Sequence, residues 1–95
     1  SNYPVEVAER WYPLAIRSGY TKARPALVAF VQRTGRRKLI IPIYRALAET
    51  PEGRRLAERT FAKARAGYHP LTISGIRSAI DDAAKQARKP KSRTP

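Results

Sequence analysis

The stretch TPEGRRLAERTFAKARAG, residues 50–67, carries both a start signal and a stop signal for one helix. Thr50 offers a hydroxyl cap, Pro51 fits the first helical position, and Glu52 complements the positive end of the helix dipole. Gly67 is typical of the position just beyond a helix end. The spacing of the apolar residues predicts a helix with one side packed against a core. Its apolar face consists of Ala57, Phe61, Ala64 and Tyr68, and a basic row on another side consists of Arg55, Arg59 and Lys63.

Apolar stripes of the same kind occur on both sides of this stretch. Leu27, Phe30 and Val31, for example, recur at the spacing of a helical face, and no useful alternation of apolar and polar residues predicts a strand. Pro13 predicts a kink or a later start in the first helix, because proline removes one hydrogen bond. Helices are predicted over residues 4–18, 22–34, 39–49, 51–66 and 70–87.

Five helices with short connections predict an all-α fold of antiparallel neighbours. The arrangement is either a short α-α superhelix of the armadillo or HEAT kind or a compact bundle. We expect one helical domain over residues 3–87. Residues 88–95 contain four cations, no acid and no large apolar residue, and predict a basic disordered tail.

Charge is the most unusual property of the composition. The chain has 20 Lys and Arg against 7 Asp and Glu, a formal net charge of +13. Such a balance indicates an anionic partner: nucleic acid, an acidic membrane surface or a carboxylate ligand. No apolar run is long enough to span a membrane. The compartment stays open; we favour the cytoplasm, with a bacterial periplasm as the alternative.

Catalytic residue types are scarce in this sequence. There is no cysteine, which excludes disulfides, thiolate zinc sites and a cysteine nucleophile. His69 is the single histidine, so no zinc-binding histidine pair can form. We interpret His69 as a turn residue bound to the backbone rather than a proton carrier. A self-contained enzyme is therefore not expected.

One feature departs from ordinary helix design: the segment Thr34–Lys38, TGRRK, which we call the basic turn. Its three cations lead into the start of the next predicted helix, where the dipole favours anions. That placement is unfavourable unless an anion binds or neighbouring acids compensate. Free N–H groups, a guanidinium and an ammonium together suit a carboxylate. The alternative is a solvated basic turn without a ligand.

Three segments in order resemble one known family. RWYPLAI at 10–16, GRRKL at 35–39 with PIY at 42–44, and YHPLT at 68–72 are similar to the C-terminal helical domain of leukotriene A-4 hydrolase and related bacterial aminopeptidases. The resemblance implies a parent zinc aminopeptidase with an N-terminal β domain, a thermolysin-like catalytic domain that holds the zinc, and this helical domain closing one side of the substrate cleft. The family's domain extends further on its N-terminal side, so we expect an excised piece.

The resemblance also assigns roles to individual residues. It implies that Arg36 and Lys38, supported by Gly35 in the turn, bind the carboxylate of a peptide with a free C-terminus. No catalytic residue, metal ligand or cofactor is expected in this domain, which should be inactive alone. The expected partners are the catalytic domain of the same chain and the peptide substrate, not nucleic acid or a membrane. Arg37 and Ile41 depart from the family pattern and favour plain peptide hydrolysis over epoxide hydrolysis.

The strongest alternative from the residues is a basic helical module that binds nucleic acid, through a surface such as the row on residues 55–63. A third possibility is a stand-alone helical scaffold for an acidic protein partner.

Overall fold

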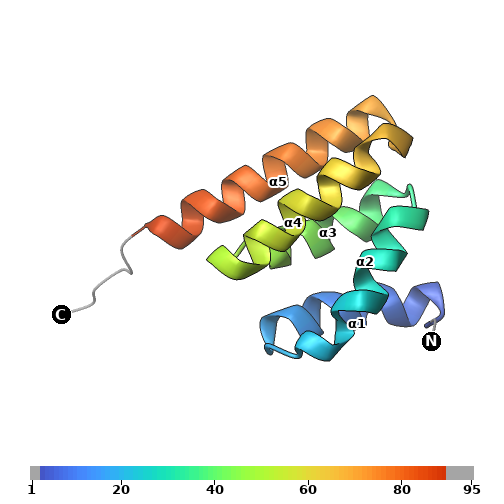
Figure 1. Cartoon of the computed structure of the whole chain (residues 1–95), viewed down its shortest axis with the longest axis horizontal. Helices are drawn as coiled ribbons and strands as arrows, with labels where there is room; N and C mark the ends of the chain where they lie inside the picture. Colours follow the sequence, from blue (N-terminus) through green and yellow to red (C-terminus); the bar gives the residue numbers. More distant parts are fainter. Residues whose placement is uncertain (1–2, 90–95) are drawn as a thin grey trace.

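The computed structural model describes residues 3–89. Within that range the chain forms helices joined by short connections, with no strand (Figure 1). The prediction of an all-α domain is confirmed. The elements in chain order are α1 (Val5–Arg17), the 3-10 helix η1 (Thr21–Ala23), α2 (Arg24–Arg33), α3 (Arg37–Leu47), α4 (Pro51–Ala64), the 3-10 helix η2 (Arg65–Gly67) and α5 (Pro70–Arg88).

The helix α4 begins as its sequence predicts. The hydroxyl of Thr50 accepts a hydrogen bond from the N–H of Gly53 at 3.1 Å. One turn further on, the guanidinium of Arg54 donates to the carbonyl of Ala48 at 3.0 and 3.2 Å, which ties α4 to the end of α3. The α-helix ends at Ala64, earlier than predicted, because the chain continues as the tighter η2.

The helix α1 continues through Pro13, so the alternative of a later helix start is wrong. The carbonyl that loses its donor belongs to Glu9, an exposed residue. The helix ends at Arg17, just before the predicted Gly19, whose φ of +76° lies in the left-handed region that favours glycine. The N–H of Tyr20 then reaches back to the carbonyl of Ala15 at 2.9 Å, as in a Schellman ending.

The central helix of the domain is α3, which packs against α1, α4 and α5. The helices α4 and α5 run antiparallel beside each other, whereas α1 packs against another part of α3 and α2 lies against α4 (Figure 1). The apolar stripe of α3 is at most 1% exposed. This burial fixes both ends of α3, including the end that begins in the basic turn. The stripe consists of Ile40, Ile43, Tyr44 and Leu47.

The helix α5 extends to Arg88, one residue past the predicted domain boundary at 87. Lys85 and Arg88 lie in its last turn, where their positive charges interact favourably with the negative end of the helix dipole and stabilise the extension. The predicted disordered tail from residue 90 onward lies outside the described residues. None of the helices in residues 3–89 is long and apolar enough to cross a membrane.

Candidate carboxylate-binding turn

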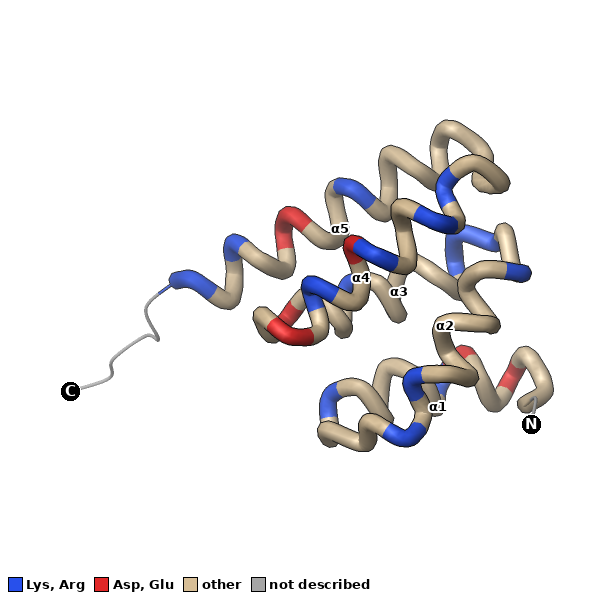
Figure 2. Tube along the Cα trace, viewed as in Figure 1, with Lys and Arg blue, Asp and Glu red and all other residues tan. Residues whose placement is uncertain are grey.

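The basic turn joins α2 to α3. Thr34, Gly35 and Arg36 form the connection, and Arg37 and Lys38 are the first two residues of α3. The sequence predicts a helix start at residue 39. Arg37 and Lys38 therefore lie inside the first turn of α3 rather than before it. The turn lies at the same end of the domain as the connection between α4 and α5, and Figure 2 shows cations on both connections.

The start of α3 has no cap. Arg36 occupies the N-cap position with an extended backbone, and no side chain accepts a hydrogen bond from the first-turn N–H groups. Its carbonyl accepts from the N–H of Leu39 and Ile40 at 3.0 and 3.1 Å. Within residues 3–89, the N–H groups of Arg37 and Lys38 have no hydrogen-bond partner. Two free donors therefore point out of an exposed positive helix end.

The cations of the basic turn are exposed and unpaired. Arg36, Arg37 and Lys38 are all exposed, and α3 has no acid in its first turn. None of the three forms an ion pair with any described residue, so compensation by neighbouring acids is not observed. The ion pairs of the described region lie elsewhere and join Arg17 to Glu49, Arg24 to Glu52, and Arg77 to both Glu58 and Asp81.

Gly35 is not required by the fold of this domain. A Cβ at this position would meet nothing within 4 Å. Gly19 alone has a positive φ among the described residues, so the backbone at Gly35 does not need glycine either. The space beside Gly35 is open on the outside of the turn, where a ligand or another domain could approach.

Two buried tyrosines support the basic turn from the interior of the domain. The hydroxyl of Tyr68, in the connection between η2 and α5, donates to the carbonyl of Val31 in the last turn of α2. The hydroxyl of Tyr44 on α3 lies 3.0 Å from that of Tyr68. Burial raises the pKa of both groups, so both remain neutral hydroxyls. In the sequence, Tyr68 belongs to an apolar face and to the YHPLT segment, and neither pattern indicates this connection.

His69 has the structural role that its position predicts. Its Nδ1 accepts a hydrogen bond from the N–H of Leu71 at 3.0 Å, and the residue forms the N-cap of α5. The interpretation of His69 as a turn residue bound to the backbone is confirmed. Within residues 3–89 no group of His, Cys, Asp and Glu is placed to hold a metal ion.

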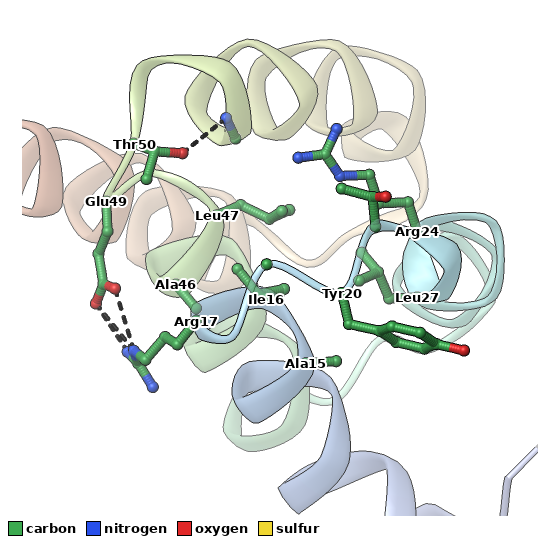
Figure 3. A pocket seen from close by; sticks show the side chains of 13 residues that line it. Ala15, Ile16, Arg17, Tyr20, Arg24, Leu27, Ala46, Leu47, Glu49 and Thr50 are labelled. Carbon is green, nitrogen blue, oxygen red and sulfur yellow. Dashed lines mark hydrogen bonds and ion pairs between the residues drawn. The ribbon is translucent and has the colours of Figure 1, made fainter.

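A hollow of about 270 Å³ lies at the other end of α3 (Figure 3). Arg17 and Arg24 line it, together with residues of α3 and of the connection to α4. Arg17 already binds Glu49 through three hydrogen bonds of 2.9–3.2 Å, and Arg24 binds Glu52 at 3.2 Å. Both guanidinium groups are therefore neutralised, which makes this hollow a poorer carboxylate site than the basic turn, roughly 16 Å away along α3.

The fold and the site together define a small basic helical domain, in which the turn between α2 and α3 presents exposed cations without ion-pairing acids among residues 3–89. Comparison with known proteins gives its family. The family described as Leukotriene A4 hydrolase, C-terminal, matches residues 1–80, and the chain belongs to it.

Its curated relatives are much longer proteins. The leucine aminopeptidase 2 of Eremothecium gossypii is 34% identical over 73 residues, 77% of this chain and 11% of the relative. The leucine aminopeptidase 2 of Kluyveromyces lactis is 38% identical over 72 residues, which cover 76% of this chain and 11% of the relative. That of Yarrowia lipolytica is 36% identical over 66 residues, which cover 70% of this chain and 10% of the relative. The chain thus spans about a tenth of each relative. No solved structure gives a significant match.

Proposed function

We propose that this chain is the C-terminal domain of a zinc aminopeptidase, in which it closes one side of the substrate cleft. Its family membership supports this role, and so do relatives that carry the name leucine aminopeptidase. In the parent enzyme, a thermolysin-like domain of the same chain holds the zinc that supplies the hydrolytic chemistry. The present domain binds and orients the peptide and is inactive alone. A cytoplasmic location for the parent enzyme stays a prediction.

The basic turn is the part of the domain that receives the substrate. Arg36 and Lys38 bind the C-terminal carboxylate of a short peptide, while the free N–H groups at the start of α3 add to the attraction. The observation that carries this proposal is an uncapped helix start with exposed cations and no acid within ion-pairing distance among residues 3–89. A bound carboxylate would supply the missing negative charge.

Anchoring the carboxylate selects short peptides with a free C-terminus. A charge-assisted hydrogen bond contributes about 1.5–3 kcal/mol, which corresponds to a factor of roughly ten or more in affinity. The contact holds the peptide at one end while its amino end lies near the catalytic groups. The reaction we expect is plain peptide hydrolysis.

The test compares a tripeptide with its C-terminal amide as substrates of the intact enzyme. Arg36→Ala and Lys38→Ala should lower kcat/KM for the free acid roughly tenfold or more, with unchanged zinc content and little effect on the amide. Arg59→Ala is the matched control, because Arg59 is an exposed cation on α4, away from the basic turn. An unchanged preference for the free acid in both turn variants rejects the carboxylate role.

A further inference from the structure

The basic turn joins two helices that have different packing partners. The helix α2 packs mainly on α4 and η1, whereas α3 packs mainly on α5 and α1. Contacts between α2 and α3 themselves are few. The direction in which the turn presents Arg36 and Lys38 therefore depends on whatever fixes the end of α2 relative to the start of α3.

The tyrosine pair makes that connection. Val31 is completely buried, and its carbonyl belongs to the last turn of α2, where no helical donor is available. The hydroxyl of Tyr68 supplies the donor. Because Tyr68 has one proton and a carbonyl can only accept, the hydroxyl of Tyr44 must donate to Tyr68. A single oxygen on Tyr68 therefore links α2 to α3 across the base of the turn.

Each tyrosine is itself held in place. The ring of Tyr44 packs edge-on against Phe61 of α4, with ring centroids 5.9 Å apart. The backbone N–H of Tyr68 donates to the carbonyl of Arg65 at 3.0 Å, at the end of η2. The oxygen of Tyr68 is thus held from outside the turn, by η2 and the connection to α5, and its partner Tyr44 is held by α4.

We infer that Tyr68 is a positioning residue for the carboxylate site. It fixes the orientation of the basic turn by donating a hydrogen bond to the carbonyl of Val31 at the end of α2 and accepting one from the hydroxyl of Tyr44. This inference rests on the proposed function of Arg36 and Lys38. Loss of the hydroxyl leaves the buried carbonyl of Val31 without a partner and frees the end of α2. The cations remain present, but the backbone that carries them is no longer held in one position.

The test uses Tyr68→Phe and Tyr44→Phe in the intact enzyme, again with a tripeptide and its C-terminal amide. Tyr68→Phe should lower the ratio of kcat/KM for acid over amide roughly three- to tenfold, mainly through a higher KM for the acid. Tyr44→Phe should lower the ratio less, because the bond from Tyr68 to Val31 remains. Tyr12→Phe is the control, since Tyr12 is also buried but lies in α1, outside this chain of hydroxyls.

A merely structural role predicts a different pattern. If Tyr68 serves only stability, its loss lowers acid and amide turnover equally or leaves both unchanged, and either result overturns the inference. If Tyr68→Phe fails to fold, Tyr44→Phe decides alone by the same ratio. Arg36→Ala is measured in parallel. A changed ratio for Arg36→Ala with none for either tyrosine rejects the positioning role only, whereas no change for Arg36→Ala rejects the carboxylate site and the inference with it.

Discussion

The backbone of Gly53 passes so close to Leu47 that a Cβ at position 53 would lie 2.1 Å from the Leu47 carbonyl oxygen. Real Cβ atoms do not approach backbone this closely, so α4 would have to move away from the end of α3. We predict that Gly53→Ala destabilises the domain by roughly 2–3 kcal/mol, although alanine is ordinarily the better helix former. Urea unfolding followed by circular dichroism measures the change. Equal stability of variant and wild type would contradict the close approach.

Gly35→Ala, unlike Gly53→Ala, should not destabilise the domain. Open space surrounds this position and its φ is not positive, so alanine fits and stability should be unchanged or higher by about 0.4–1 kcal/mol. The variant therefore separates folding from substrate binding. If the turn faces a substrate in the intact enzyme, KM for a free-acid tripeptide rises while the unfolding midpoint does not fall. A loss of stability would show that the turn needs glycine for its own shape.

The N-cap of α4 offers a test of local helix chemistry. Thr50→Ala removes the acceptor for the N–H of Gly53 and should lower the free energy of unfolding by about 1 kcal/mol. Thr50→Ser keeps a hydroxyl and should retain most of that stability. Thermal unfolding of the two variants in parallel distinguishes the hydrogen bond from a general effect of substitution. Equal losses would rule out a role for the hydroxyl.

Acid should weaken one interhelical ion pair. The hydrogen bond and charge of Arg24 hold the pKa of Glu52 below its usual range. A lowered carboxyl pKa in the folded state gives stability that is present above the ordinary pKa and lost as the pH falls through the lowered one. The stability difference between wild type and Glu52→Gln should therefore shrink on acidification. Arg24→Met should abolish the same pH-dependent component, and a difference independent of pH would contradict the pairing.

The large positive charge should not produce tight nucleic-acid binding. The row of Arg55, Arg59 and Lys63 is exposed on α4, but charge alone gives only weak, salt-sensitive association. In a gel shift with duplex and single-stranded DNA, we expect any complex at about 50 mM salt to disappear at about 200 mM. A sequence-selective complex that survives the higher salt would favour the nucleic-acid-binding alternative instead.

Local signals in the sequence correctly predicted several helix starts and ends. The hydroxyl and proline at Thr50 and Pro51, and the glycine at position 19, act within a few residues and need no distant partner. The buried stripe of α3 was equally readable from its spacing. The start of α3 was placed two residues too late because Arg36 carries no capping side chain that would mark it.

The long-range contacts could not be predicted in the same way. The bond from Tyr68 to Val31 joins residues 37 positions apart, and nothing in either residue type indicates the other. The close approach of Gly53 to Leu47 depends on the packing of α4 over α3, which a helical pattern does not encode. The candidate cations were found from the sequence, but their lack of acidic partners within residues 3–89 required the fold.

The most direct measurement is an experimental structure of the intact enzyme with a slowly hydrolysed tripeptide bound. We predict that the C-terminal carboxylate lies within about 3.2 Å of the guanidinium of Arg36 and of the ammonium of Lys38, at the uncapped start of α3. A peptide whose carboxylate binds other residues, with the basic turn facing bulk solvent, would contradict the proposed site.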